Sequence, residues 1–249
     1  MWQPTGGFLS TMEKLPAPGY RLRTLAAPPE GAGHAPTMKT PPYPCDHDAA
    51  ITRLRGGDRR LGLLIDRVGP IRLRSLHPLT PFQCLLKSIV YQQLSGQAAS
   101  TIYRRLLSLF PGSRPPTARR LAAVSEAELR AAGLSRAKVA AVKDLAARAL
   151  AGQVPDARVL GRLSDEEIVT RLTEVRGVGR WTVEMLLIFR LGRADVLPVN
   201  DLGIRRGFML TYGLDQLPGA AQLNRAGECW QPYRSVASWY LWRATELDW

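Results

Sequence analysis

Residues 172–185 constrain the fold of this chain more than any other stretch. They read Leu-Thr-Glu-Val-Arg-Gly-Val-Gly-Arg-Trp-Thr-Val-Glu-Met, with Gly177 and Gly179 in the middle. Glycine tolerates a positive φ or a close backbone approach that other residues resist, so this pair predicts a tight hairpin between two helices. Pro198-Val-Asn-Asp201 follows, and it predicts a loop that brings one carboxylate to the start of a third helix.

A hairpin of this kind presents successive backbone N–H groups at the N-terminus of its second helix. These amides, together with the helix dipole, favour a bound phosphate. Such a contact holds a nucleic-acid backbone without reading its bases. The segment therefore predicts a nucleic-acid backbone site.

The charge of the chain also indicates an anionic partner, because the formal net charge is +13 and the pI is near 10.4. Residues 75–163 hold 13 basic against 4 acidic side chains, whereas residues 164–249 hold 10 against 11. Phosphate affinity at the hairpin must therefore come largely from backbone amides. A GC-rich genome would explain the choice of arginine over lysine, but not the surplus of positive charge.

Almost no segment alternates with period 2, so we predict an all-α fold. N-cap residues, a proline at N1 and two Ser-x-x-Glu capping boxes mark where helices begin. The expected helices begin at or near Thr80-Pro81, Ser95, Ser125, Ser135, Ser164, Arg180, Asp201 and Pro232.

Residues 1–44 contain 9 of the 19 prolines, which favours a partly disordered N-terminal arm. The helical core should occupy residues 45–249. No apolar run approaches the roughly 20 residues of a membrane-spanning helix, and no signal peptide is visible. We therefore expect an intracellular protein with no membrane partner.

The cysteines and histidines predict neither a metal site nor a disulfide framework. Cys45, Cys84 and Cys229 lie far apart without a C-x-x-C spacing, and the three histidines form no pair at helical spacing. We expect no metal and no cofactor, except for a monovalent cation that the hairpin carbonyls could hold.

Three further segments extend the motif set: Ser-Ile-Val-Tyr-Gln-Gln-Leu-Ser at 88–95, Pro-Val-Asn-Asp-Leu-Gly-Ile-Arg at 198–205, and the Trp-rich run at 230–242. With the hairpin, they resemble the helix-hairpin-helix–GPD superfamily of DNA repair glycosylases over about residues 46–249. The resemblance is strongest to the bacterial 3-methyladenine DNA glycosylase II family.

This resemblance implies two helical lobes with the active-site cleft between them. One lobe would span about residues 75–195, and the other would combine residues 45–74 with 196–249. Larger family members carry a separate β-rich N-terminal domain, for which residues 1–44 are too short and too proline-rich.

The resemblance places the catalytic carboxylate at Asp201. At the start of a helix, this side chain should lie near unpaired N–H groups and the positive end of the dipole, which favours the charged form. A fixed anion stabilises the oxocarbenium-like sugar left by a departing base. The alternative is a simple helix cap, a role that Asn200 could fill equally well.

Trp181 decides the reaction class. Relatives that also nick the strand have a nucleophilic lysine at this position, whereas this chain has no lysine after Lys143. Water should therefore be the nucleophile, and the enzyme should be monofunctional.

The resemblance also implies residues that would hold the flipped base and the DNA. Indole rings would stack on a cationic alkylated purine, although both tryptophans could instead be ordinary core. The tip of the turn would fill the gap in the base stack, although polar residues are common in such turns. The base pocket would be Trp181, Trp242, Met185 and Leu202; the wedge Gln93 and Leu94, with Tyr91 or Ser95 in support; and the backbone site Val175, Gly177, Gly179 and Thr182.

Together, these features predict a monomeric, monofunctional DNA glycosylase of base excision repair. It would remove alkylated purines of the 3-methyladenine and 7-methylguanine type from double-stranded DNA, in a bacterial cytoplasm and near the nucleoid. Two alternatives remain open: a non-catalytic helix-hairpin-helix DNA-binding module, and a bifunctional glycosylase with AP-lyase activity.

Overall fold

The computed structural model describes residues 45–73 and 79–249, and within them the regular structure is entirely helical, as predicted. The proline-rich arm predicted for residues 1–44 lies outside the described residues. The α-helices are α1 (His47–Gly57), α2 (Arg59–Val68), α3 (Pro81–Tyr91), α4 (Gly96–Ser108), α5 (Ala118–Ala123), α6 (Glu126–Ala131), α7 (Arg136–Leu150), α8 (Ala157–Leu160), α9 (Asp165–Leu172), α10 (Arg180–Leu186), α11 (Leu202–Tyr212), α12 (Ala220–Ala226) and α13 (Arg234–Ala244).

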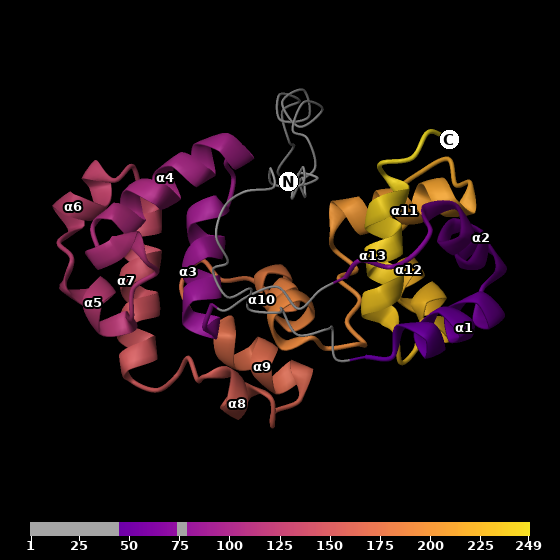
Figure 1. The fold of residues 1–249 in the computed structure, drawn as a ribbon, viewed down its shortest axis with the longest axis horizontal. Coiled ribbons are helices and arrows are strands. Elements are labelled where there is room, and N and C mark those ends of the chain that lie inside the picture. The colour runs from indigo at the N-terminus through magenta and orange to yellow at the C-terminus, as the bar shows by residue number, and fades with distance from the viewer. Residues whose placement is uncertain (1–44, 74–78) are drawn as a thin grey trace, which may run out of the picture.

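The helices form two groups that lie side by side (Figure 1). In one lobe, α7 packs against α3, α5 and α6, while α10 contacts α3 and α9. In the other lobe, α13 packs against α2 and α11, and α1 joins them through α2. The second lobe thus combines the start of the described chain with its end.

Local capping explains where most helices begin. Thr80 caps α3 and exchanges hydrogen bonds with Gln83, and Ser125 and Ser164 do the same with the glutamates three residues on. Ser95 caps α4 and Ser135 caps α7. These starts confirm the helices expected from the sequence.

Two expected helices differ in detail from the prediction. The helix expected to begin at Pro232 begins at Arg234, because Tyr233 is its N-cap and Pro232 lies in the preceding turn. The second hairpin helix continues from Arg180 to Leu191, but its last part, Leu187–Leu191, is a π-helical turn. A π turn adds one residue to the helical repeat and rotates the side chains that follow it.

Asp58 connects the elements of the C-terminal lobe. Its Oδ1 accepts the N–H groups of Arg60 and Leu61, each at 3.0 Å, and so caps α2. Its Oδ2 accepts Trp230 Nε1–H at 2.9 Å and the Tyr212 hydroxyl. A single carboxylate therefore ties α2 to α11 and to the turn before α13.

Helices α11 and α13 approach each other closely at Gly207. A Cβ atom there would lie 1.9 Å from the carbonyl oxygen of Leu241, so no larger residue fits without moving a helix. This contact fixes the distance between the two helices that carry Asp201 and Trp242.

None of the helices in residues 45–73 and 79–249 combines the length and apolar character needed to span a bilayer.

Candidate active site

Asp201 is the N-cap residue of α11. Its Oδ1 accepts the Ile204 N–H at 2.8 Å, and the residue is only 7% exposed. The cap is therefore Asp201 itself and not Asn200, which the sequence had left as an equal alternative. This structural role does not exclude a chemical one, because Oδ2 takes no part in the cap.

Two indole rings complete the surroundings of the Asp201 carboxylate. Trp181 Nε1–H donates to Oδ2 at 2.7 Å, and Trp242 Nε1–H donates to Oδ1 at 2.9 Å. Trp181 belongs to α10 in one lobe, and Trp242 belongs to α13 in the other. The structure thus brings three predicted site residues together where the lobes meet, each indole directing its N–H edge at the carboxylate.

Gly203 makes this arrangement possible, although sequence reasoning did not single it out. A Cβ atom at this position would lie 3.0 Å from Trp242 Cδ1 and 3.1 Å from Asp201 Oδ1. A side chain at 203 would therefore require the Trp242 indole or the Asp201 carboxylate to shift. The only signal in the sequence was a glycine in the first turn of a helix, where it has no local purpose.

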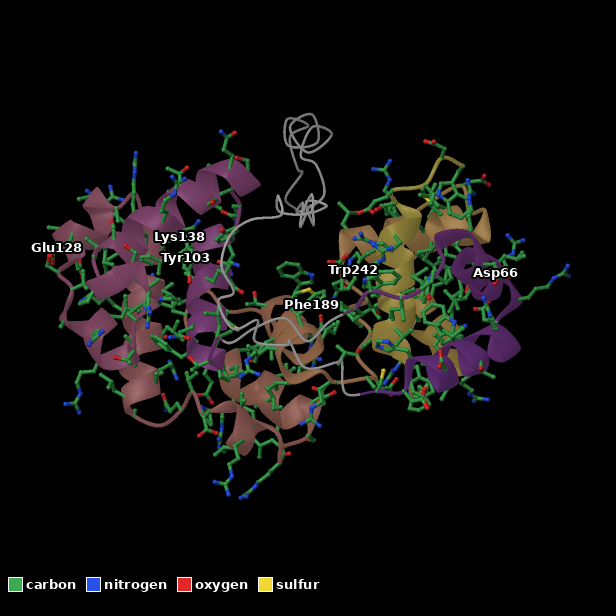
Figure 2. The ribbon with its side chains drawn as sticks, in the orientation of Figure 1. Asp66, Tyr103, Glu128, Lys138, Phe189 and Trp242 are labelled. Carbon is green, nitrogen blue, oxygen red and sulfur yellow. The ribbon has the colours of Figure 1, made fainter. Side chains whose placement is uncertain are left out.

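Phe189 is a second residue that sequence reasoning missed. Its ring stacks on Trp242, with the ring centroids 5.6 Å apart and the planes at 26°, and Figure 2 shows the pair at the centre of the molecule. Phe189 lies in the π-helical turn that follows α10. The irregular turn therefore supplies the ring that supports one face of Trp242.

The remaining predicted pocket residues, Met185 and Leu202, do not join this cluster equally. Met185 is half-buried and packs against the core. Leu202 is 62% exposed, because it lies at the first position of α11 and points away from the core. The expected pocket role of Leu202 therefore has no support from contacts within the protein.

Glu184, a third residue missed from sequence, is a buried carboxyl one turn beyond Trp181. It is 7% exposed, and its Oε1 lies 3.9 Å from Arg180 Nη1. Burial raises the pKa of Glu184 to about 7; Arg180 lowers that pKa, while Glu166 and Asp201 raise it further. The carboxyl groups of Glu184 and Asp201 thus lie near each other at the junction of the lobes, but only that of Asp201 accepts indole N–H groups.

The hairpin matches its prediction at one glycine and not at the other. Gly177 has φ +78°, and a Cβ there would lie 3.3 Å from Ala141 Cβ on α7, so both reasons for glycine apply. Gly179 has φ −95°, and nothing lies within 4 Å of a Cβ at that position, so the expectation of a strained or crowded backbone there is wrong.

The hairpin also leaves backbone donors exposed. In the part of the chain that the structure describes, the N–H groups of Gly177 and Gly179 donate to no protein acceptor, and both residues are exposed. Val175 and Thr182, the other predicted backbone-binding residues, are buried. The Thr182 N–H already donates to the Gly179 carbonyl at 3.0 Å. Among the four predicted backbone-binding residues, the available donors are therefore those of the two glycines.

The predicted wedge occupies the turn between α3 and α4. Gln93 is at its tip with φ +56°, a left-handed conformation that is uncommon outside glycine, and Leu94 is 38% exposed. Ser95 Oγ accepts the Ala98 N–H at 3.3 Å and so serves as the cap of α4. The two residues predicted to enter the base stack are thus both on the surface.

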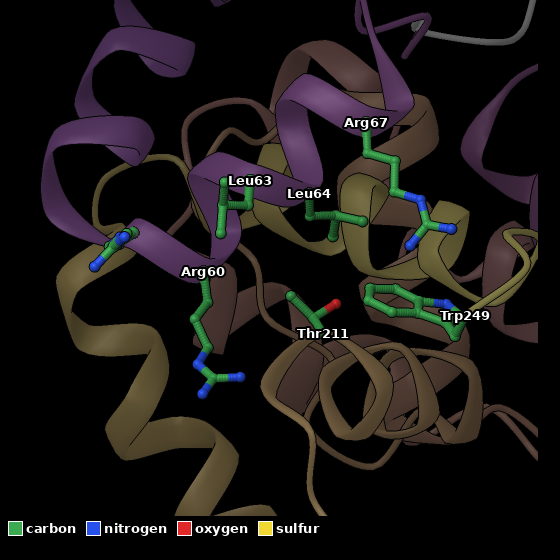
Figure 3. Close-up of a pocket in the computed structure, with 7 residues that line it drawn as sticks. Arg60, Leu63, Leu64, Arg67, Thr211 and Trp249 are labelled. Atoms are coloured by element: carbon green, nitrogen blue, oxygen red, sulfur yellow. The ribbon is translucent and has the colours of Figure 1, made fainter.

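A cavity of about 350 Å³ lies elsewhere, between α2 and the C-terminal Trp249 (Figure 3). Its lining is Arg59, Arg60, Leu63, Leu64, Arg67, Thr211 and Trp249. None of these residues belongs to the predicted base pocket, so this cavity is separate from the predicted site. Among residues 45–73 and 79–249, no three histidine, cysteine or acidic residues are grouped as metal ligands would be.

Comparison with known proteins identifies relatives over most of the chain. Residues 86–232 match the family described as HhH-GPD superfamily base excision DNA repair protein. A DNA-3-methyladenine glycosylase 1 of Schizosaccharomyces pombe is 36% identical over 199 residues, which cover 80% of this chain and 87% of that protein.

Two solved structures share the fold and are also 36% identical. One is a 3-methyladenine DNA glycosylase of the same yeast in complex with abasic DNA, with a TM-score of 0.73, covering 80% of this chain and 97% of that one. The other is a DNA-3-methyladenine glycosidase from Bacillus halodurans, with a TM-score of 0.72, covering 78% and 88%. These matches confirm the family resemblance and the fold class drawn from the sequence.

Proposed function

Because the chain belongs to the HhH-GPD superfamily of base excision DNA repair proteins, we propose that it is a monofunctional DNA glycosylase that removes alkylated purines from duplex DNA. The observation that carries this proposal is the Asp201 carboxylate, which two indole N–H groups and one backbone N–H hold at the junction of the lobes. A DNA-binding module without chemistry has no use for such a site.

Asp201 acts on the sugar. As the C1′–N bond breaks, its electron pair leaves with the base and positive charge develops on C1′ and the ring oxygen. The fixed carboxylate stabilises that charge, water adds at C1′, and the proton lost by the water passes to solvent. An N-alkylated purine is cationic and departs as a neutral base, so the enzyme needs little acid catalysis.

Trp181 and Trp242 act on the base. Their N–H edges are directed at Asp201, and Phe189 supports one face of Trp242. A cationic purine stacked on an exposed indole face gains about 0.5–2 kcal/mol from cation–π attraction. This preference supports alkylated purines of the 3-methyladenine and 7-methylguanine type as substrates.

The hairpin and the turn after α3 act on the DNA. The exposed N–H groups of Gly177 and Gly179 are placed to hold a phosphate, with the hairpin carbonyls as the place for a monovalent cation. Gln93 and Leu94 enter the base stack when the damaged nucleotide is extruded. We propose that the enzyme acts as a monomer, in the compartment that holds the chromosome.

The lysines support a reaction without a covalent intermediate. Trp181 occupies the position of the lyase nucleophile, and the last two lysines donate to backbone carbonyls. Lys138 Nζ bonds to Val90 and Gln92, and Lys143 Nζ bonds to Ala122 and Val124. Their amines are committed to helix ends and do not approach Asp201 through any hydrogen bond.

The test compares the wild type with Asp201→Asn on methylated duplex DNA. Asparagine can still cap α11, but its Nδ2–H would meet the Trp181 N–H, a contact between two donors, so a modest fall in melting temperature is expected. Base release should drop by at least 100-fold. Strand breaks should appear only after alkali, and borohydride should trap no enzyme–DNA adduct.

Equal base release by the wild type and a folded Asp201→Asn variant would leave the carboxylate as a cap and nothing more. If the wild type binds DNA but releases no base, the chain is a non-catalytic module. A trapped adduct would indicate the bifunctional alternative.

A further inference from the structure

The turn that carries the predicted wedge is tied directly to the hairpin. Gln92 Nε2–H donates to the carbonyl oxygen of Gly177 at 2.8 Å, joining residues 85 positions apart in the chain. Gln92 immediately precedes Gln93 and is half-buried, whereas Gln93 is exposed. One side chain thus links the surface proposed to hold a phosphate with the surface proposed to enter the base stack.

Helix α7 braces the turn from behind. Lys138, in its first turn, donates through Nζ to Val90 O at 2.6 Å and to Gln92 O at 2.8 Å. These carbonyls belong to the C-terminal end of α3, where a cation is favourable. Figure 2 shows Lys138 in the lobe that contains α3 and α7, and burial lowers its pKa from the ordinary value.

The same helix braces the hairpin. Asp144, six residues after Lys138, accepts the Arg176 N–H through Oδ2 at 2.8 Å, and Arg148 Nε holds that oxygen at 3.0 Å. Between these two positions on α7, Ala141 lies against Gly177. Helix α7 therefore holds the wedge turn and the hairpin at once, and the Gln92–Gly177 bond closes the ring.

We propose that Gln92 is a positioning residue for base extrusion, which fixes the wedge at a set distance from the phosphate held by the hairpin. The inference rests on the proposed function, because it takes Gln93 and Leu94 as the wedge. Unstacking a nucleotide costs a few kcal/mol. A wedge can offset that cost only if its turn keeps a fixed position relative to the hairpin that binds the DNA backbone.

The backbone at the tip supports this role. Gln93 has φ +56°, a conformation that non-glycine residues adopt only when their surroundings impose it. The residue just before it has both of its polar ends engaged: the carbonyl by Lys138 and the side chain by Gly177. The strained tip is thus held from one side by bonds to α7 and the hairpin.

The test uses Gln92→Met, which keeps the length of the side chain but removes the donor. Single-turnover excision of a 7-methylguanine should slow by roughly 3- to 10-fold when the lesion is fully paired. It should slow less than 2-fold when the lesion lies opposite an abasic site, where extrusion costs less. The fluorescence rise of a 2-aminopurine beside the lesion should shrink in parallel, while affinity for undamaged duplex changes less than 2-fold.

Gln83→Ala is the matched control. Gln83 lies on the same helix and also donates to a backbone carbonyl, Pro115 O at 3.1 Å, but at the end of α3 away from the wedge. The Gln83→Ala variant should have a lower melting temperature than the wild type. The ratio of its excision rate on the paired lesion to its rate on the lesion opposite an abasic site should equal that of the wild type. Equal slowing of Gln92→Met on both substrates, or no slowing on either, would overturn the inference. An inactive wild type would instead count against the proposed function.

Discussion

At the scale of single residues, the Asp201 carboxylate accepts three N–H groups, of which only one belongs to its own helix. The two indoles therefore fix the direction of the carboxylate, and this role is distinct from the stacking proposed for their rings. Stacking depends on the ring, whereas this bond depends on the N–H, so the two contributions can be separated by substitution.

Trp181→Phe keeps an aromatic ring and removes the donor to Asp201. We expect excision to slow by roughly 5- to 30-fold on cationic and neutral lesions alike, since a hydrogen bond to a charged group is lost. Trp181→Ala should slow cationic lesions further than neutral ones, because it also removes the cation–π contact. Single-turnover excision rates of both variants on 7-methylguanine and hypoxanthine measure the contribution of the hydrogen bond and that of the cation–π contact.

Trp239→Phe is the control for this pair. Trp239 is a buried indole on α13 that makes no hydrogen bond to Asp201. If Trp181→Phe slows excision no more than Trp239→Phe does, the indole N–H has no role in the chemistry.

Glu184 makes stability depend on pH. Its pKa of about 7 lies above the ordinary 4.5, so the folded protein holds this proton where the unfolded chain has released it. The resulting stabilisation is complete below pH 4.5 and is lost as the pH rises through 7. Glu184→Gln should therefore gain stability relative to the wild type as the pH rises, by at most about 3 kcal/mol at pH 8.

Melting temperatures of both proteins at pH 5 and pH 8 measure this effect. The difference between variant and wild type should be more favourable to the variant at pH 8. A difference that is the same at both pH values would show that folding does not raise the pKa of Glu184.

At the scale of elements, the contact of α11 with α13 supports the site. Gly207→Ala would place a methyl group on the Leu241 carbonyl, where a Cβ lies 1.9 Å from the oxygen. We expect a loss of about 2–4 kcal/mol in stability, since the helices must separate. Excision should fall too, because α11 carries Asp201 and α13 carries Trp242.

Gly219→Ala is the matched control, because nothing lies within 4 Å of a Cβ there and φ is −70°. Chemical denaturation of the two variants gives the comparison. A Gly207→Ala protein as stable as Gly219→Ala would contradict the close approach of the helices.

The helix starts could be predicted from sequence because capping is local. Thr80, Ser95 and Ser164 each bond to a backbone N–H three residues ahead. The π-helical turn of Phe189 could not be predicted, since nothing in its local sequence breaks the helical pattern.

Within the site, Asp201 and both tryptophans could be found because they stand in recognisable motifs. Gly203 and Glu184 could not. The need for glycine at 203 comes from the Trp242 ring on α13, which lies 39 positions later in the chain. The environment of Glu184 comes from its burial in the folded protein. The pocket role of Leu202 stays a prediction, because its side chain is exposed.

At the scale of the whole molecule, the site belongs to neither lobe alone. The segment that joins them is fixed to the start of α13. Arg234 Nε donates to Asp195 Oδ1 at 2.7 Å, and Ser235 Oγ both donates to Arg193 O at 2.6 Å and accepts the Val196 N–H at 3.0 Å. These bonds keep the two lobes in a defined orientation at Asp201.

The charge is divided between the same two parts. The lobe of residues 75–195, which includes the wedge turn and α7, holds 18 basic against 10 acidic side chains, while residues 45–74 and 196–249 together hold 12 against 9. Long-range attraction to DNA should therefore act more strongly on the lobe that contains the wedge than on the lobe that carries Asp201.

The missing side chain of Gly203 has a consequence for how this enzyme can change over generations. An indole at 242 and any side chain at 203 compete for one volume. A larger residue at 203 should be better tolerated in a lineage that has a smaller residue at 242, and a large ring at 242 should be better tolerated where 203 is glycine. The identities of the two positions should therefore vary together among descendants of this sequence.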